Sequence, residues 1–430
     1  MKKVLFWGDN PHGITGFGKV VKNIIRQVYD PGKFTIDVLG ISYIGDPYQP
    51  DHYMGRDILY DVYPPFEMGK QMDLYGANKL MTMLSSNKVD ILFILQDTFI
   101  IRNIMQQIVE LREKLSNKFQ IIYYFPIDCN FVYPDWITRA VSLADYPVCY
   151  TEFGKKVAIK HDKKLKGMDV IYHGTDKSLY RPWENEMRNQ IRASFWKETA
   201  DKFLVLNVNR NQPRKDLNRT FAVFSELKRR VPDSFLFVLA SPADIGGNII
   251  DVAKQFGLEW GTDWLSPDPN KYNMMLGIPE DQIVTIYNTV DVCISTTLGE
   301  GWGLSLTEAM ACGCPVVFPD NTSITEIIGK DKDDNGLRGT LISSGVMGNR
   351  ICLGAQDNNL SRPLVDVGMM VDSLVKIANL RDKDINVFKT KAINATKWVP
   401  DWTDVGSEWV RIFEEASVAH DESKGKANES

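Results

Sequence analysis

The chain has 430 residues, a length that predicts two or three domains rather than a single hydrophobic core. Hydrophobic residues make up 44% of the sequence and charged residues 24%, a balance that excludes a disordered or fibrous chain. The formal net charge of -5 excludes a general attraction to polyanions, so a nucleic-acid partner would need a local basic patch.

The cysteines and the apolar runs predict a reducing, cytoplasmic setting. The six cysteines are scattered and form no CxxC pair, and Cys312-x-Cys314 lacks a second pair of soft ligands for zinc. The first residues, "MKKVLFWGDN", reach a charge after a few apolar residues, which predicts a strand rather than a signal-peptide core. No apolar run approaches the length of a bilayer span.

Short apolar runs alternate with amphipathic stretches along the first part of the chain. The expected strands are 3–9, 34–41, 89–97, 120–128, 146–151 and 168–174, and the expected helices are 18–29, 72–86, 101–115 and 153–162. Strands that are apolar on both faces and alternate with helices predict a parallel sheet covered on both sides.

The pattern restarts after a boundary near 175–185, where "HGTDKSLYRPW" is polar and contains proline. Strands are expected at 203–209, 235–241, 282–288, 290–295 and 314–320, and helices at 216–230, 304–312, 322–329, 366–382, 384–397 and 402–418. The sequence therefore predicts an α/β protein with two Rossmann-like domains, at 1–178 and 179–400, and a polar, frayed tail at 421–430.

The loop after the first strand, "GDNPHGITGFGKV", is rich in glycine and leads into a helix. Gly16 and Gly18 let backbone amides approach a ligand, and the start of a helix favours an anion. The spacing is GxxGxG rather than the GxGxxG of dinucleotide-binding proteins, and Asp37, the acid at about the right distance, lies inside a strand. A tight turn without a ligand is the alternative.

Strand 203–209 runs into "NRNQPRKDLNRT", which places Arg210 and Lys215 just beyond its end. Two cations at this edge suit a diphosphate, because a guanidinium binds it as a fork and an ammonium as a point charge. Ordinary surface cations are disfavoured here, since the helix dipole repels them unless an anion is present. Arg214 and Arg219 are expected to be solvated.

The stretch "TTLGEGWGLSLTEAM" (296–310) sets two glutamates around a glycine-rich loop and the start of a helix. Glu300 lies in the loop and Glu308 about one turn into the helix, so the two carboxylates are expected to contact different parts of one ligand. A carboxylate accepts hydrogen bonds from sugar hydroxyls. The alternative is that Glu308 only complements the helix dipole and Glu300 only forms a turn.

These motifs, in this order, resemble the family-4 retaining glycosyltransferases of the GT-B fold. "VIYHGTD" (170–176) is similar to V-I-x-N-G-V-D, and "EGWGLSLTEAMACGCPVV" (300–317) is similar to E-G-F-G-L-x-x-x-E-A-M-A-x-G-x-P-V-V. "SITEIIG" (323–329) resembles the segment that usually follows. The resemblance covers nearly the whole chain and implies two Rossmann-like domains facing a central cleft. A last helix, at about 402–420, would cross back to the N-terminal domain.

The resemblance also implies roles for particular residues. Glu300 and the amides of Gly301, Trp302, Gly303 and Leu304 would contact the donor sugar, Arg210 and Lys215 its diphosphate, and Glu308 the ribose. Gly16, Gly18 and their neighbours would face the phosphates from the other domain.

The chain departs from the family near the reacting sugar carbon. Many members have a His-Asp or similar pair there, whereas "YYFPIDCN" has Ile127 before Asp128 and no histidine. Asp128 is the expected substitute, and His12 and Asp97 are further candidates on the acceptor side. His173 replaces the usual Asn and is expected to be structural.

The implied reaction is transfer of a sugar from a UDP- or GDP-sugar to an acceptor hydroxyl with retention of configuration. No cofactor and no metal are expected, and "DKDDN" (331–335) is interpreted as solvated charge despite its DxD spacing. The alternatives are a GT-B sugar-nucleotide epimerase and a catalytically silent sugar-nucleotide-binding protein; the glycine spacing disfavours a nicotinamide-dependent oxidoreductase.

The sequence leaves the acceptor open among a glycan, a lipid and a modified DNA base, and it does not determine the oligomeric state. The basic stretch "KKVAIKHDKKLK" (155–166) could meet an anionic lipid or nucleic acid, although a solvated face is the more common meaning of such a run. The aromatic-rich segment 43–66 is the better candidate, because aromatic loops stack on sugars and bases.

Overall fold

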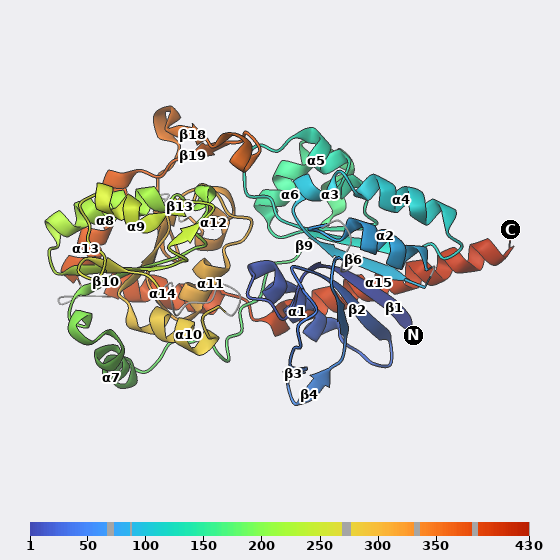
Figure 1. Cartoon of the computed structure of the whole chain (residues 1–430), viewed down its shortest axis with the longest axis horizontal. Coiled ribbons are helices and arrows are strands. Elements are labelled where there is room, and N and C mark those ends of the chain that lie inside the picture. Colours follow the sequence, from blue (N-terminus) through green and yellow to red (C-terminus); the bar gives the residue numbers. More distant parts are fainter. Residues whose placement is uncertain (67–72, 87, 269–276, 331–335, 381–385, 430) are drawn as a thin grey trace. The chain divides into compact units, whose positions relative to one another are not determined.

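The computed structural model describes residues 1–66, 73–86, 88–268, 277–330, 336–380 and 386–429. The chain divides into two compact units (Figure 1). Unit 1 comprises residues 1–127, 132–174 and 402–430, and unit 2 comprises residues 128–131 and 175–401. The four residues 128–131 pack with unit 2 although the chain on either side of them belongs to unit 1.

Unit 1 contains a seven-stranded sheet in the order β5-β2-β1-β6-β7-β8-β9, and every neighbouring pair is parallel. The strands are β1 (Lys2–Asp9), β2 (Phe34–Ile41), β5 (Asp61–Tyr63), β6 (Ile91–Leu95), β7 (Gln120–Phe125), β8 (Tyr146–Cys149) and β9 (Asp169–Val170). The helices are α1 (Gly16–Val28), α2 (Ala77–Ser85), α3 (Thr98–Ile101), α4 (Met105–Lys114), α5 (Pro134–Thr138), α6 (Glu152–Ile159) and α15 (Trp402–Glu429). A small antiparallel hairpin, β3 (Asp51–Tyr53) and β4 (Arg56–Ile58), lies within the aromatic-rich segment.

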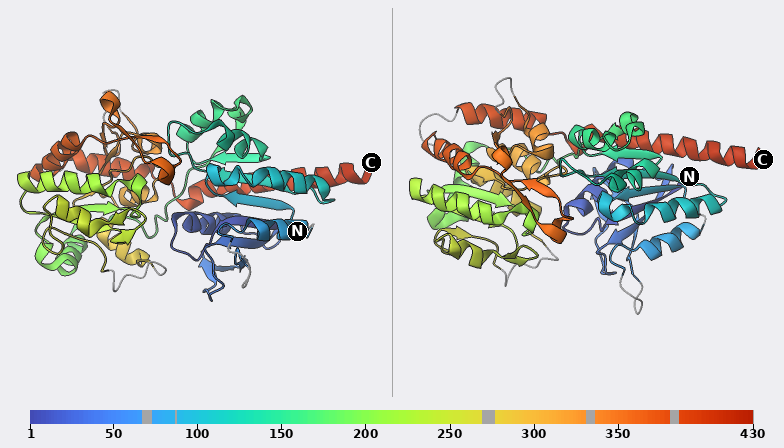
Figure 2. Two further views of the ribbon diagram at one scale, coloured as in Figure 1. Left: turned by 45° about the horizontal axis from the view of Figure 1, so that its top comes forward. Right: turned by 90° about the horizontal axis from the view of Figure 1, so that it is seen from above.

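Helix α15 is part of unit 1, as expected for a C-terminal helix that returns to the first domain (Figure 2). Its residue Trp409 is fully buried, and its ring packs edge-on against Phe93 of β6 and Tyr124 of β7, with centroid distances of 5.7 and 4.7 Å. Phe413, one turn later, stacks on Phe93 at 5.8 Å. The helix therefore completes the core of the sheet, although strands β6 and β7 lie roughly three hundred residues before it along the chain.

The end of α15 differs from the frayed tail expected at 421–430, because the helix continues to Glu429. Hydrogen bonds and ion pairs hold this part of the helix to residues at the starts of β1 and β6. Lys2 Nζ lies 2.5 Å from Asp421 Oδ1 and 2.8 Å from His420 Nδ1, and Lys424 Nζ lies 3.4 Å from Asp90 Oδ1.

Unit 2 contains a six-stranded sheet in the order β14-β11-β10-β15-β16-β17, and it is also parallel throughout. The strands are β10 (Phe203–Val208), β11 (Ser234–Leu239), β14 (Trp264–Leu265), β15 (Val292–Ile294), β16 (Val316–Pro319) and β17 (Thr340–Ile342). The helices are α7 (Asn185–Trp196), α8 (Leu217–Arg230), α9 (Ile249–Gln255), α10 (Glu280–Thr289), α11 (Leu304–Ala311), α12 (Thr322–Ile328), α13 (Val367–Leu380) and α14 (Asn386–Trp398). Two antiparallel hairpins, β12 (Ala243–Asp244) with β13 (Gly247–Asn248) and β18 (Arg350–Cys352) with β19 (Ser361–Pro363), extend from the loops.

The strand expected at 282–288 is wrong: these residues lie within helix α10. The run "QIVTIYN" is rich in β-branched residues, which favour strands when the local pattern alone is considered. Acidic Glu280 and Asp281 occupy the first turn, where they complement the helix dipole, and Val284, Tyr287 and Asn288 form one buried face. Packing against a helical neighbour therefore outweighs the local preference.

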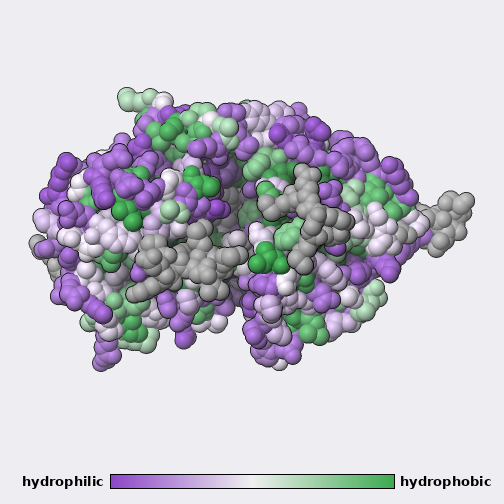
Figure 3. Space-filling model, in the orientation of Figure 1, coloured by the Kyte–Doolittle hydropathy of each residue, from purple (hydrophilic) through white to green (hydrophobic). Residues whose placement is uncertain are grey.

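No helix among the described residues is long and apolar enough to cross a membrane. On the face drawn in Figure 3, hydrophobic residues form separate small patches within a mostly hydrophilic surface.

We expect Trp409→Ala to destabilise unit 1 by about 3–5 kcal/mol, because it leaves a large cavity between α15 and the sheet. Hydrogen exchange of the β6 and β7 amides at increasing urea concentration measures this loss. Val418→Ala is the matched control, since Val418 lies on the same helix and is 58% exposed. An equal effect of the two substitutions would contradict the packing of α15 described above.

Candidate functional site

Two loops of unit 2 meet because their strands are neighbours in the sheet. Strand β10 pairs with β15 in parallel, so the carboxyl ends of both strands lie at the same edge. After β10 the chain forms a short 3₁₀ helix, η4 (Pro213–Lys215), before α8 begins. After β15 it forms the glycine-rich loop 295–303 before α11. The Leu298 amide donates to the Arg214 carbonyl at 2.9 Å, which joins the two loops directly.

Lys215 and Glu300 form a buried ion pair between these loops. Lys215 Nζ lies 2.5 Å from Glu300 Oε1, and Glu300 is only 8% exposed. The backbone of Glu300 is also held in place: its amide donates to the Thr322 hydroxyl at 2.9 Å, and the Ser323 hydroxyl donates to its carbonyl at 2.7 Å. The carboxylate is therefore fixed at both its backbone and its side chain.

Burial and charge act in opposite directions on this pair. Burial raises the pKa of Glu300, but the positive charges of Lys215 and Arg214 outweigh it and hold the pKa below its ordinary value. Burial lowers the pKa of Lys215, and the attraction of Glu300 opposes this effect only in part.

Arg214 extends the ion pair to Asp128. Its Nη1 lies 3.5 Å from Glu300 Oε2 and donates to the Gly299 carbonyl, and its Nε lies 3.2 Å from Asp128 Oδ2. Arg214 was expected to be solvated, and this expectation is wrong. The 3₁₀ turn η4 is closed by Asp216 in the left-handed conformation (φ 46°), and the side chains of Arg214 and Lys215 both reach the loop after β15.

Arg362 binds the other side of Asp128. Its Nη1 lies 3.1 Å from Asp128 Oδ1 and also donates to the Asp128 carbonyl. Its Nε and Nη2 donate to the two carboxylate oxygens of Asp357, at 2.6 and 2.8 Å, and the whole residue is only 2% exposed. Burial raises the pKa of Asp128, but Arg362 and Arg214 outweigh it and lower the pKa. We call Asp128, Arg214, Lys215, Glu300, Asp357 and Arg362 the charged cluster.

The structure thus brings together three predicted residues, Asp128, Lys215 and Glu300, but it does not bring Arg210 to them. Arg210 binds Asp244 of β12 through two hydrogen bonds of 2.8 and 3.1 Å, and its side chain is 60% exposed. Sequence reasoning missed Arg362 because no motif marks "SRP", and its partner Asp128 is far away along the chain. From the sequence, Arg214 was expected to be solvated, although its position next to Lys215 indicated a further cation at this site.

Glu308 lies one turn into α11 and is 9% exposed, and the Tyr287 hydroxyl lies 3.3 Å from its Oε2. The helix begins after Gly303, whose φ of 98° favours glycine. Amides in the first turn of a helix have no acceptor within the helix, so the start of α11, from Gly301 to Leu304, can bind an anion or sugar oxygens. The ring of Trp302 is buried and stacks against Trp398 at a centroid distance of 6.4 Å.

In unit 1, Gly18 of the first loop is explained by packing. A Cβ on Gly18 would lie 2.3 Å from the Asn10 carbonyl oxygen, so the loop folds back on α1 only with glycine there. The Gly18 amide donates to the Thr15 hydroxyl at 3.0 Å, which caps the helix, and that hydroxyl donates to Asp9 at 2.6 Å. Gly16 is exposed at the start of α1. A phosphate contact by Gly16 and Gly18 stays a prediction.

The two predicted acceptor-side residues of unit 1 differ in their surroundings. His12 stacks on Tyr48 at 4.1 Å, within the aromatic-rich segment, and burial followed by the charge of Lys22 lowers its pKa to about 4. Asp97 is half-buried and directly precedes α3, at the carboxyl end of β6. His173 is a core residue: burial lowers its pKa to about 3, and its Nδ1 lies 2.7 Å from the Tyr124 hydroxyl.

The basic stretch 155–166 forms α6 and the 3₁₀ helix η2 (Lys163–Gly167). Lys155 donates to the Met168 carbonyl at 2.6 Å, whereas Lys156 and Lys160 are exposed. No three His, Cys, Asp or Glu side chains gather as a metal site would require within the described part of the chain. The stretch "DKDDN" (331–335) lies outside the described residues.

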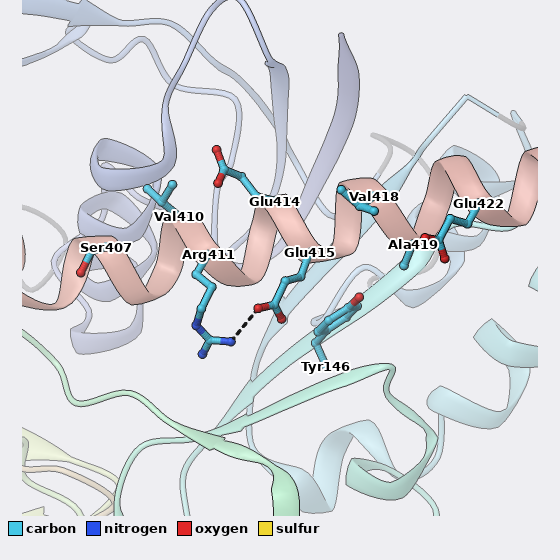
Figure 4. Close-up of a pocket in the computed structure, with 9 residues that line it drawn as sticks. All are labelled: Tyr146, Ser407, Val410, Arg411, Glu414, Glu415, Val418, Ala419 and Glu422. Atoms are coloured by element: carbon cyan, nitrogen blue, oxygen red, sulfur yellow. Dashed lines mark hydrogen bonds and ion pairs between the residues drawn. The ribbon is translucent and has the colours of Figure 1, made fainter.

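A groove of about 820 Å³ in unit 1 runs along α15 (Figure 4). It is lined by Tyr146, Ser407, Val410, Arg411, Glu414, Glu415, Val418, Ala419 and Glu422, which include none of the predicted site residues. A cavity of about 420 Å³ in unit 2 adjoins the loops of the charged cluster, with Pro213, Asp216 and Leu298 on one side and Ile351, Leu353 and Gln356 on another.

Residues 189–345 match the model of the family described as "Glycosyl transferases group 1", and this match lies within unit 2. The chain is 28% identical over 185 residues to a D-inositol 3-phosphate glycosyltransferase of Corynebacterium aurimucosum, which is 42% of this chain and 41% of that protein. It is 24% identical over 184 residues to the protein of that name from Mycolicibacterium smegmatis, covering 42% and 38%. The chain thus matches about two fifths of the length of these relatives.

Solved structures resemble nearly the whole chain. Anabaena Alr3699/HepE, solved in complex with UDP and glucose, has a TM-score of 0.66 at 14% identity and covers 96% of this chain and 100% of its own. Sucrose-phosphate synthase of Thermosynechococcus elongatus has a TM-score of 0.70 at 13% identity and covers 97% and 100%. These neighbours show that the chain has the GT-B fold, which confirms the fold class predicted from the sequence.

We expect Gly299→Ala to displace residues 128–131 from unit 2, because its Cβ would lie 2.1 Å from the Asp128 carbonyl oxygen. Overpacking of this kind typically costs about 1–3 kcal/mol, which equilibrium urea unfolding measures. Gly368→Ala is the control: Gly368 lies in α13 and its nearest contact is an ordinary 3.4 Å, so its effect should be about 1 kcal/mol or less. The same urea midpoint for both variants would contradict the close packing of Gly299 against the Asp128 carbonyl.

The lowered pKa of Glu300 predicts a pH dependence of the stability of unit 2. Its carboxyl binds protons more weakly in the folded than in the unfolded chain, so its stabilising effect is complete above the ordinary pKa of 4.5. The effect is lost as the pH falls from there through the lower, folded-state value. Urea unfolding at a series of pH values should therefore show a steeper loss on acidification for the wild type than for Glu300→Gln. Parallel curves would show that Glu300 does not contribute.

Proposed function

We propose that the protein transfers a sugar from a nucleotide diphosphate sugar, UDP- or GDP-linked, to an acceptor hydroxyl with retention of configuration. The observation that carries the proposal is the buried Lys215–Glu300 pair at the edge of a Rossmann-like sheet, beside the start of α11. The match of residues 189–345 to glycosyl transferases group 1 supports it, as does the UDP bound by the Anabaena structure.

The donor sugar would bind to Glu300 and to the first amides of α11, and the ribose to Glu308. Lys215 would bind the diphosphate, together with a guanidinium. Arg210 is the guanidinium predicted from the sequence, but it is exposed and paired with Asp244, whereas Arg214 lies in the charged cluster. Asp128 would lie beside the reacting sugar, in the place of the missing histidine.

In the reaction, the bond between the anomeric carbon and the diphosphate oxygen breaks, and a bond from the acceptor oxygen to the same face of that carbon forms. The acceptor proton passes to the departing diphosphate oxygen, so the protein needs no carboxylate nucleophile. Lys215, Arg214 and the amides of α11 would stabilise the negative charge that develops on the diphosphate. No metal or cofactor is required by this scheme.

The acceptor would bind on unit 1, near His12 and the aromatic segment 43–66, where His12 and Tyr48 already form a stacked pair. Neutral His12, with its pKa of about 4, can accept or donate one hydrogen bond to a hydroxyl. A glycan, a lipid headgroup or a modified base each offers such a hydroxyl.

We expect the wild-type protein to consume at least one donor from a panel of labelled UDP- and GDP-hexoses. Glu300→Gln should lower kcat/KM by about 10²- to 10³-fold, because it removes the charge that orients the donor sugar and Lys215. Chromatography of the labelled products measures donor consumption by the wild type and the loss of kcat/KM in the variant. Glu226→Gln, on the exposed face of α8, is the matched control and should leave turnover unchanged.

Three other results would overturn the proposal. A free sugar with an inverted ring carbon would indicate an epimerase, and tight UDP binding without turnover of any donor would indicate a silent binding protein. Unchanged turnover in Glu300→Gln would remove Glu300 from the site.

A further inference from the structure

Asp128 is held in the way that proteins hold a phosphate group. Its two carboxylate oxygens face two different guanidinium groups, Arg214 Nε at 3.2 Å and Arg362 Nη1 at 3.1 Å. Charge-assisted hydrogen bonds from arginines to separate oxygens of one anion are the usual means of binding phosphate. Lys215, also a cation, is close enough to Asp128 to lower the pKa of its carboxyl further.

The charged cluster contains no surplus positive charge for an incoming anion. Its three cations, Arg214, Lys215 and Arg362, are balanced by three carboxylates, those of Asp128, Glu300 and Asp357. A diphosphate carries at least two negative charges, and an uncompensated anion in a buried site is strongly disfavoured. Departure of one carboxylate from the cluster would supply positive charge for an incoming diphosphate.

Asp128 is the carboxylate that can leave most easily. Its side chain is 31% exposed, compared with 11% for Glu300 and 10% for Asp357. Glu300 is fixed by its backbone hydrogen bonds, and Asp357 holds Arg362 through two short bonds. Asn130 and Phe131, after Asp128, are exposed, whereas Cys129 is buried, so the side chain of Asp128 has less burial to lose than that of its neighbour Cys129.

The departure of Asp128 would leave a preformed anion site. Arg362 would keep its orientation, because Nε and Nη2 stay bound to Asp357 while Nη1 becomes available. Arg214 Nε would become available on the opposite side. A guanidinium that is already oriented loses less conformational freedom on binding, which favours affinity.

We propose that Arg214, Lys215 and Arg362 form the diphosphate-binding site and that Asp128 occupies it as an internal counter-ion until the ligand displaces it. The inference deepens the proposed function and rests on it for the identity of the ligand as a nucleotide diphosphate. It also assigns the role expected of Arg210 to Arg214 and Arg362.

The test is calorimetric titration with pyrophosphate, which needs no turnover. Asp128→Asn removes the competing charge and should tighten pyrophosphate binding about tenfold, the change expected for a single charge-assisted hydrogen bond. Arg362→Met in the Asp128→Asn background should abolish this gain. Asp244→Asn is the matched control: it frees Arg210 in the same way, outside the charged cluster, and should leave the affinity unchanged.

Two results would overturn the inference. An unchanged or weaker affinity in Asp128→Asn would show that Asp128 does not compete with the anion. If Asp244→Asn raises the affinity for pyrophosphate and Asp128→Asn does not, Arg210 rather than the charged cluster binds the anion.

A second measurement uses the wild-type chain and does not depend on the folding of a variant. If pyrophosphate displaces Asp128, the backbone amides of 129–131 should exchange with solvent faster in its presence. Slower exchange there would mean that the ligand covers the segment instead of releasing it, which contradicts the inference. The two proposals can fail separately. If the variants bind pyrophosphate in the expected order of affinity but no sugar nucleotide is turned over, the proposed function is wrong and the anion site is still supported.

Discussion

The arrangement of the site depends on the parallel pairing of β10 with β15. Because both strands end at one edge of the sheet, the loop with Lys215 and the loop with Glu300 must meet there. A lysine and a glutamate that are 85 residues apart thereby become partners at 2.5 Å. Arg214 joins this pair to Asp128, which Arg362 binds from its other side.

Burial decides how strongly these partners depend on one another. An isolated charge in a low-dielectric interior is costly, and loss of one partner of a buried pair typically costs about 3–5 kcal/mol. Each charge of the cluster is therefore matched, and the chain supplies Asp128 and Arg362 from distant segments to complete the balance. The same balance is the basis of the proposal that an anionic ligand exchanges with a carboxylate rather than adding to the cluster.

Much of this could be predicted from the sequence, and the failures have identifiable causes. Alternating apolar runs and amphipathic stretches correctly indicated both parallel sheets, because buried parallel strands lack polar alternation. Helix α10 was missed, since its β-branched residues favour a strand when its neighbours are unknown. Lys215 and Glu300 were predicted as site residues because each lies in a recognisable motif in the loop after a strand. Arg362 carries no local signal, and the choice between Arg210 and Arg214 depends on how a single 3₁₀ turn orients the chain.

By itself, the sequence determined the fold class, the two-domain organisation of the helices and strands, and the loops that carry the charged residues. These features follow from periodicity and from the positions of strand ends, which are local properties of the chain. Only the tertiary structure decided which charges become partners: that Arg210 pairs with Asp244, and that Arg214 and Arg362 share Asp128. The physical reason is that an ion pair is set by distance in space and by burial, and neither is encoded in the spacing of the residues along the chain.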